Sequence, residues 1–304
     1  MAGERALARF EREVQLTAAL THPSTIAIYD YGRTDKGVFY YAMELIRGFN
    51  LHQLVTIEGP LPPGRVVHLL TQVCGALAEA HAAGLIHRDV KPANLMVAVV
   101  GGIPDFVKVL DFGLVKDLGA APLAAPGGPA EASSAPAAVS QDGSLLGTPL
   151  FLAPEGVTNP SAVDTRLDIY AVGCVAYFLL SGEMPFVGAT AIEIYARQRR
   201  GPPPPLSGRP GLSVPRDLEE LIFECLAFSP EKRPAAVRDV ARRLSASAQV
   251  RPWTEAMALS WWQERGPAVL EAARAAGDVV TPGTITTDSR RLAPARHFET
   301  HPGS

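Results

Sequence analysis

Lysine, cysteine and long apolar runs are all scarce in this sequence of 304 residues. The three cysteines, Cys74, Cys174 and Cys225, are far apart and form no CxxC pair, so neither a disulfide framework nor a structural zinc site is expected. The longest apolar run, Ile169–Leu180, is too short to span a bilayer, and no apolar signal region follows Met1. We therefore expect a cytoplasmic protein without a membrane span.

A strong charge of either sign is also missing. The 28 lysine and arginine residues nearly balance the 31 aspartate and glutamate residues, and the net charge of −3 offers no electrostatic footprint for nucleic acid or an anionic membrane. Disorder as the main state is excluded, because 47% of the residues are apolar and the mean hydropathy is +0.10. We expect one large folded domain or two small ones, with no nucleic-acid partner.

The spacing of apolar residues predicts a mostly helical protein with short strands in its first half. Helices are expected over residues 5–20, 64–83, 165–181, 189–200, 215–227 and 234–247. Strands are expected over residues 25–31, 38–45, 95–100 and 106–110.

Two segments differ from the rest in composition. Residues 118–146 are mostly Ala, Pro, Gly and Ser, which predicts a flexible insert. The segment from residue 249 onward contains all three tryptophans of the chain. Here we expect one helix capped by Thr254, a second helix opened by Pro267, and a frayed tail.

Four short motifs follow one another at well-defined spacing. His87–Asn94 reads HRDVKPAN and Asp111–Gly113 reads DFG; Gly147–Pro149 and Ala153–Glu155 follow the insert. In this order the motifs match the catalytic loop, the magnesium loop and the end of the activation segment in eukaryotic-type protein kinases. Over about residues 5–248, the sequence resembles the bacterial Ser/Thr protein kinases of that family.

The resemblance implies an α+β, protein-kinase-like fold with a mostly helical large lobe and a truncated β small lobe. Residues 1–46 would be a remnant of the small lobe, with one helix, two strands and the hinge. Residues 47–248 would form the large lobe around the insert at 118–146, and residues 249–304 a C-terminal helical extension with its tail.

The same resemblance assigns chemical roles to individual side chains. Asp89 would accept the proton of the attacking hydroxyl, Lys91 would place its ammonium on the γ-phosphate of ATP, and Thr148 would help to seat a Ser/Thr acceptor. Asn94 and Asp111 would hold Mg²⁺, which prefers carboxylate and amide oxygens and leaves other positions to phosphate and water. The implied function is the phosphorylation of serine and threonine hydroxyls on protein substrates.

Adenine recognition is expected at the hinge that follows the second strand. There the Glu44 carbonyl and the Ile46 N–H would bind the base. Met43 would guard the back of the pocket, and Met96 would form its floor. Taken singly, each methionine fits an ordinary core position equally well.

Other residues in the motifs are expected to be structural. By resemblance, His87 packs on Phe112 and bonds nearby backbone, and Asp168 is buried and bonded to the backbone of the catalytic loop. Glu155 and Arg233 are expected to form the ion pair that anchors the activation segment.

The sequence departs from the family at its start. Glu13 matches the helix glutamate that pairs with a strand lysine upstream, but the first lysine of the chain is Lys36, and no GxGxxG occurs anywhere. Two interpretations are open: an incomplete kinase, weak or inactive as this chain, or a pseudokinase scaffold that binds partners through the large lobe. A small-molecule phosphotransferase is a further alternative, but it would not need the Gly147–Glu155 segment.

Overall fold

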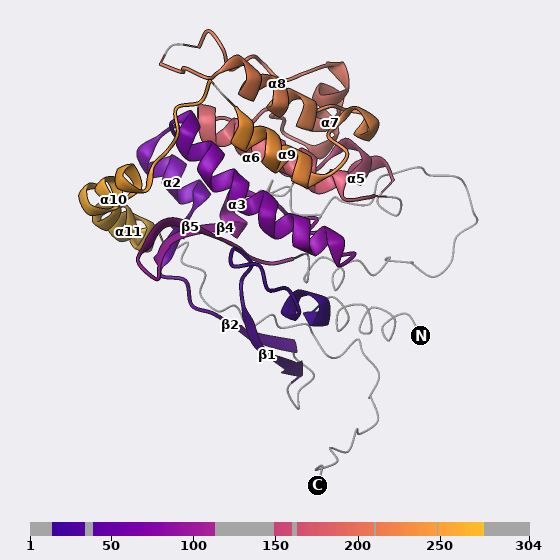
Figure 1. Ribbon diagram of the computed structural model, residues 1–304. Helices are drawn as coiled ribbons and strands as arrows, with labels where there is room; N and C mark the ends of the chain where they lie inside the picture. The colour runs from indigo at the N-terminus through magenta and orange to yellow at the C-terminus, as the bar shows by residue number, and fades with distance from the viewer. Residues whose placement is uncertain are drawn as a thin grey trace, which may run out of the picture.

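A computed structural model of the chain is shown in Figure 1. The structure describes residues 14–33, 39–112, 149–159, 163–209, 211–247 and 249–276. A small strand-containing part carries the first elements, and a larger helical part carries the rest (Figure 1). Glu13, Thr148, most of the activation segment with its insert, and the tail after residue 276 lie outside the described residues.

The small part consists of a helical turn at residues 14–18 and two antiparallel strands, β1 (Ile28–Arg33) and β2 (Phe39–Met43). Among the described residues these two strands pair only with each other. Three tyrosines of these strands are exposed to solvent, among them Tyr29 at 73%.

A second sheet belongs to the large lobe. Its strands are β3 (Gly48–Asn50), β4 (Leu95–Val100) and β5 (Ile103–Val109), paired antiparallel in the order β3-β4-β5. A parallel bridge between Thr25 and Val109 joins this sheet to the chain just before β1. The end of β5 is therefore the point where the two lobes meet.

The helices of the large lobe surround one fully buried helix. That helix is α6, in which every residue from Leu167 to Leu180 is buried. Because all its faces are covered, its sequence is apolar all round rather than striped. The other elements of the lobe are α2 (Leu51–Glu58), α3 (Pro63–Ala82), η1 (Pro92–Asn94), η2 (Pro149–Phe151), α5 (Pro154–Thr158), α7 (Ala191–Arg200), α8 (Arg216–Cys225), η4 (Pro230–Lys232) and α9 (Val237–Ala246).

The C-terminal extension forms two helices, α10 (Glu255–Glu264) and α11 (Gly266–Ala275). They lie beside α2 at one side of the large lobe and contact α2, β3 and β5 (Figure 1). Thr254 caps α10 as predicted: its hydroxyl accepts the Met257 N–H at 3.3 Å. The extension is built into the large-lobe core, because Val269 and Ala273 are buried in the same apolar cluster.

The predicted helices and strands agree with the structure to within a few residues where both are described, but the shortest elements were missed. Besides α5 and the 3-10 helices η1, η2 and η4, these include β3 and α2, which follow the hinge directly. The signal for α2 was present as a capping box: the Asn50 side chain accepts the Gln53 N–H at 2.8 Å, and the Gln53 side chain accepts the Asn50 N–H at 2.9 Å.

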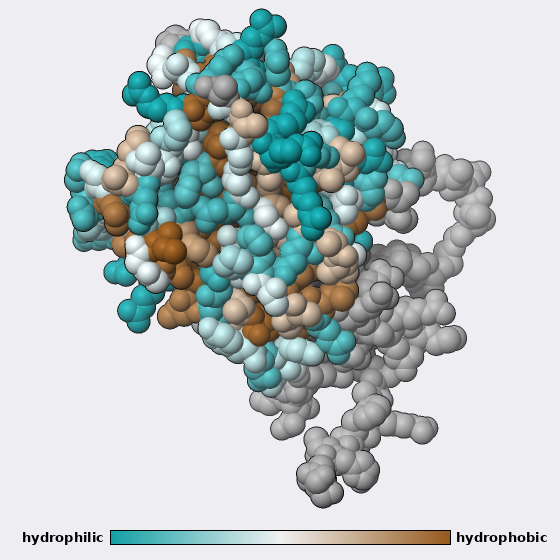
Figure 2. All heavy atoms as spheres, in the orientation of Figure 1, coloured by the Kyte–Doolittle hydropathy of each residue, from teal (hydrophilic) through white to brown (hydrophobic). Residues whose placement is uncertain are grey.

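The surface is mixed in character. On the face drawn in Figure 2, hydrophobic residues lie in small groups among hydrophilic ones. None of the described helices combines the length and the apolar composition that crossing a bilayer requires.

The packing of α6 against α8 gives a first prediction. A Cβ at Gly173 would lie 2.8 Å from the Cys225 Cβ and 3.1 Å from the Leu226 Cγ. Alanine at an open helix position is about 0.5–1 kcal/mol better than glycine, but overpacking a core costs about 1–3 kcal/mol. Gly173→Ala should therefore lower the free energy of unfolding in urea. An increase in this free energy of unfolding would show that α6 and α8 can move apart without cost.

Candidate active site

One buried carboxylate shapes the backbone of the predicted catalytic loop. Asp168, at the start of α6, is 0% exposed. Its Oδ2 accepts the His87 N–H at 2.8 Å and its Oδ1 accepts the Arg88 N–H at 2.9 Å, while the His81 Nε2 on α3 lies 2.8 Å from Oδ2. These bonds hold Arg88 at φ 63°, a left-handed conformation rare for residues with a side chain. The predicted structural role of Asp168 is confirmed; the contribution of His81 was missed.

His87 connects this loop to the next motif. Its Nδ1 accepts the Asp89 N–H at 3.3 Å, so the proton of the neutral ring is on Nε2, which donates to the Leu110 carbonyl at 2.9 Å. Burial lowers the pKa of His87 below its ordinary value, in keeping with a neutral ring. The ring packs on Phe112 with centroids 4.6 Å apart. Both predicted contacts of His87 are confirmed.

The predicted base lies in a set of three polar side chains. The Lys91 Nζ is 2.8 Å from the Asp89 Oδ2. The Asn94 Nδ2 donates to the Asp89 carbonyl at 2.9 Å and to its Oδ2 at 3.0 Å. Asp89 is thus held by a cation and an amide, and both partners come from the same loop.

The two predicted metal ligands are brought together by the backbone. The Leu110 N–H donates to the Asn94 carbonyl at 2.9 Å, and Asp111 follows Leu110 directly. Asp111 adopts φ 51°, in the left-handed region. Such a conformation in a residue other than glycine is retained where the surrounding structure fixes it, often at functional sites.

The donor atoms at this place suit a magnesium ion that is shared with phosphate. Among the described residues, no hydrogen-bond donor contacts the Asn94 Oδ1 or the Asp111 Oδ2, both hard oxygen ligands. No group of three His, Cys, Asp or Glu side chains in the described chain could hold a metal alone. The remaining positions would thus fall to phosphate and water.

Tyr41 on β2 joins this group, and the sequence reading missed it. Its hydroxyl donates to the Asp111 Oδ1 at 3.0 Å. Burial, and then the nearby Asp111 carboxylate, raise the pKa of Tyr41 above its ordinary value, so the phenol keeps its proton and remains a donor. The contact joins β2 of the small part to the magnesium loop, two segments 70 residues apart in sequence.

The residues predicted around adenine also meet. Ile26, Met96 and Leu110 form a small apolar cluster, separate from the main core, and Met43 and Ile46 pack against it. Met43 and Met96 thus pack in one apolar cluster, which fits either a pocket wall or an ordinary core position. They line the junction between the hinge and β4.

The hinge leaves two backbone groups open. The Glu44 N–H donates to the Ala27 carbonyl at 2.9 Å, and the Glu44 side chain is 2.5 Å from the Lys108 Nζ. Within the described residues, no hydrogen bond is made by the Glu44 carbonyl or the Ile46 N–H. These are the two groups expected to bind the base.

The end of the activation segment is anchored as predicted. The Arg233 guanidinium meets the Glu155 carboxylate with two bonds of 2.6 and 2.8 Å and also donates to the Ala227 carbonyl. This bidentate pair fixes α5 on the large lobe.

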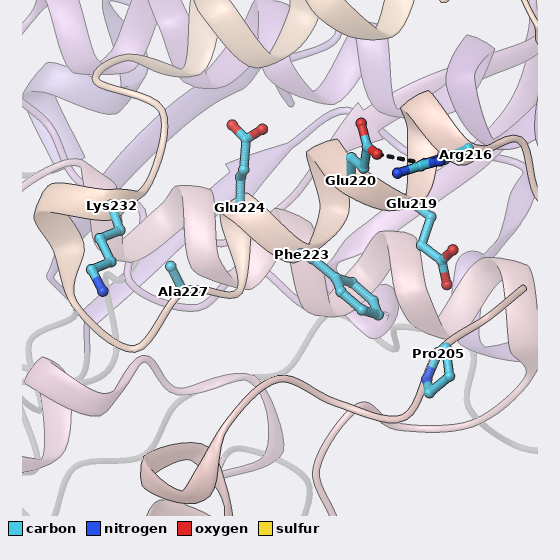
Figure 3. Close-up of a pocket in the computed structure, with 8 residues that line it drawn as sticks. All are labelled: Pro205, Arg216, Glu219, Glu220, Phe223, Glu224, Ala227 and Lys232. Carbon is cyan, nitrogen blue, oxygen red and sulfur yellow. Dashed lines mark hydrogen bonds and ion pairs between the residues drawn. The ribbon is translucent and has the colours of Figure 1, made fainter.

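A hollow of about 560 Å³ lies beside α8, away from this site (Figure 3). Its carboxylates are already engaged: Glu219 accepts the Leu206 N–H at 2.6 Å, Glu220 pairs with Arg216, and Glu224 pairs with Arg243. The hollow therefore offers little free chemistry.

Fold and site together are those of a protein kinase. The protein kinase domain family matches residues 2–244, and the chain belongs to that family. It is most usefully compared with bacterial relatives. It is 38% identical over 247 residues to serine/threonine-protein kinase pkn3 of Myxococcus xanthus, covering 81% of this chain and 43% of that protein. It is 39% identical over 229 residues to PknB of Mycobacterium tuberculosis, covering 74% and 33%.

Among solved structures, the crystal structure of Rad53 1-466 in complex with AMP-PNP matches with a TM-score of 0.57 and 22% identity. The match covers 77% of this chain and 53% of that one, and it supports the kinase-like fold. The chain spans less than half the length of the two bacterial relatives.

The Tyr41 contact gives a second prediction. Tyr41→Phe removes a donor that orients Asp111, and such outer partners of metal ligands are typically worth about 10- to 100-fold in metal affinity. We expect Tyr41→Phe to need about tenfold more Mg²⁺ for half-maximal ATP binding, measured by calorimetry. Tyr40→Phe, on the same strand but 42% exposed, is the matched control. Equal Mg²⁺ requirements in the two variants would refute the role.

Proposed function

We propose that this chain carries the phosphoryl-transfer site of an ATP- and Mg²⁺-dependent protein serine/threonine kinase. The observation that carries the proposal is the way Asp89 is held between the Lys91 ammonium and the Asn94 amide, with Asn94 bonded to the strand end that leads into Asp111. In-line phosphoryl transfer requires a proton acceptor, a cation and magnesium ligands at one point, and these residues supply them.

Each residue has a defined part in this proposal. Asp89 accepts the proton of the attacking serine or threonine hydroxyl as its oxygen bonds to the γ-phosphorus of ATP, while the bond from that phosphorus to the β–γ bridging oxygen breaks and ADP leaves. Lys91, already beside Asp89, neutralises charge on the transferred group. The Glu44 carbonyl and the Ile46 N–H bind adenine, against the apolar surface of Met43 and Met96.

Asn94 and Asp111 would hold magnesium through the side-chain oxygens that are free of protein partners. When bound, the ion neutralises the negative charge of the phosphates and keeps the γ-phosphate in line. Thr148, proposed to seat the acceptor, lies outside the described residues.

A pseudokinase scaffold that binds partners through the large lobe is the second candidate function. The sequence contains no GxGxxG. Of the lysines in the described residues, Lys91 pairs with Asp89, Lys108 pairs with Glu44, and Lys232 lies in η4. None of these three takes the place of a strand lysine on the phosphates.

The role of Asp89 gives a third prediction. Asp89→Asn keeps the shape of the side chain but removes the proton acceptor, so phosphoryl transfer should fall by about 10²-fold or more while ATP binding persists. Asp239→Asn, on the surface of α9 where it pairs with Arg242, is the control. Transfer from radiolabelled ATP to a generic basic protein substrate is the measurement. Undiminished phosphoryl transfer by Asp89→Asn would refute the assignment of Asp89 as the proton acceptor.

A fourth prediction separates the two candidate functions. Positioning groups that hold the γ-phosphate supply much of the rate of such enzymes. We expect the 304-residue chain alone to bind ATP weakly, with Mg²⁺ required, and to transfer phosphate well below the ordinary ~1–100 s⁻¹ of kinases. Calorimetry with and without Mg²⁺ decides the matter. If ATP shows no Mg²⁺-dependent binding, the scaffold is favoured. Phosphoryl transfer at ordinary kinase rates would contradict the weak activity expected of this chain.

A further inference from the structure

The C-terminal extension takes no part in the proposed phosphoryl transfer. The protein kinase domain family matches only as far as residue 244, so α10 and α11 lie beyond it. All three tryptophans of the chain lie in this segment. Two of them reach across to a single carboxylate on β5.

That carboxylate belongs to Asp105, which sits at an irregularity of the strand. The pairing of β4 with β5 shifts register between Ala98 and Val100, and Asp105 opposite this shift adopts φ 50°. A bulge of this kind re-aims a side chain, and aspartate tolerates the left-handed conformation better than most residues. The Asp105 side chain is thereby directed into the protein, where it is 0% exposed.

Four donors surround the buried carboxylate. The Arg65 Nη2 and the Trp262 Nε1 donate to Oδ1 at 2.7 and 2.8 Å. The Arg65 Nε and the Trp253 Nε1 donate to Oδ2, each at 2.9 Å. Arg65 comes from α3 and is itself 1% exposed, so the pair is fully buried.

A buried ion pair depends on such additional donors. Removing two charges from water is costly, and their attraction compensates only when the remaining lone pairs are also bonded. The two indole N–H groups supply these additional donors to the Asp105 carboxylate. The Trp261 ring covers the Arg65 guanidinium, whose carbon lies 3.8 Å from the ring centroid. Without the extension, Asp105 would lose half of its donors and its cover.

The backbone next to Asp105 transmits this constraint to the candidate active site. The Gln72 side chain of α3 bonds the Asp105 carbonyl and the Val107 N–H, replacing the ladder bonds that the bulge displaces. A few residues on, the Val109 N–H donates to the Ser24 carbonyl, and the Leu110 N–H donates to the Asn94 carbonyl. One end of β5 is therefore fixed by the extension, and the other end leads into the magnesium loop.

A second contact runs to the hinge side. Trp262 stacks on Phe49 of β3 with ring centroids 5.1 Å apart. In β3, Phe49 pairs with Val97, and Asn50 pairs with Met96. The same indole thus touches the strand that follows the hinge and pairs with the predicted adenine floor.

We propose that the C-terminal extension is a positioning element for the nucleotide site, in which Trp253 and Trp262 act through Asp105 to hold the end of β5, and with it Asn94 and Asp111, in place. The ligand identity rests on the proposed function. The mechanical connection from the tryptophans to Leu110 rests only on the contacts described above.

Hydrogen exchange on the nucleotide-free full chain tests the connection. The variants are Trp253→Phe and Trp262→Phe, which keep a ring but remove a donor to Asp105. Trp261→Phe is the matched control, because it keeps an aromatic ring over the Arg65 guanidinium and removes an N–H that does not donate to Asp105. The probes are the Val109 and Leu110 amides, with the Leu244 amide of α9 as the internal reference.

We expect exchange at Val109 and Leu110 to become about tenfold faster or more in Trp253→Phe and Trp262→Phe, as loss of a hydrogen bond to a charged group implies, with Leu244 unchanged. Trp261→Phe should match the wild type. Equal exchange in all three variants would overturn the proposal. So would acceleration that is uniform across β5 and α9, since it would mean general destabilisation.

Calorimetry with ATP and Mg²⁺ then keeps the two proposals apart. If the wild type binds, Trp262→Phe should raise the dissociation constant for ATP well above that of Trp261→Phe. Identical dissociation constants would contradict a positioning role. If the wild type binds no nucleotide, the proposed function fails, while the exchange pattern still decides whether the extension holds β5.

Discussion

The Asp168 carboxylate, buried at the start of α6, is the constraint on which the site depends. A charge in a fully covered apolar helix is tolerated only if it is well bonded. Here the donors are backbone N–H groups of the catalytic loop, and they force Arg88 into a left-handed conformation. The cost of burying Asp168 is therefore tied to the shape of the loop that carries Asp89.

The strand β5 has a comparable role on the other side of the site. It ends where the parallel bridge from Thr25, the Asn94 carbonyl and the His87 ring all meet it. Its other end carries Asp105, held by α3 and by the tryptophans of the extension. Two left-handed residues flank its central part, Asp105 near its start and Asp111 just beyond its end. A strand fixed in this way is well suited to hold Asp111 at a set distance from Asp89.

Local sequence patterns predicted much of the fold and of the candidate site. The order and spacing of the His87–Asn94, Asp111–Gly113 and Ala153–Glu155 motifs predicted the kinase-like fold and grouped Asp89, Lys91 and Asn94, because these residues lie in one loop and interact locally. Helices such as α3 and α6 were predicted because apolar periodicity and buried length are properties of a contiguous segment. The short β3 and α2 were missed, since three strand residues leave almost no periodic signal.

What the sequence alone determined was the class of protein and the residues of the catalytic loop, whose interactions span few positions. Two contacts between distant segments, that of Asp168 with the catalytic loop and that of Glu155 with Arg233, were expected from the resemblance and are present. The other long-range contacts were decided only by the tertiary structure. Tyr41 reaches Asp111 across 70 residues, and Trp262 reaches Asp105 across 157 residues. The sequence around a tyrosine or a tryptophan does not indicate which carboxylate its phenol or indole will bond. The partner is set by how β2, β5 and α10 pack, and burial then makes the bond obligatory because an unpaired polar group is costly there.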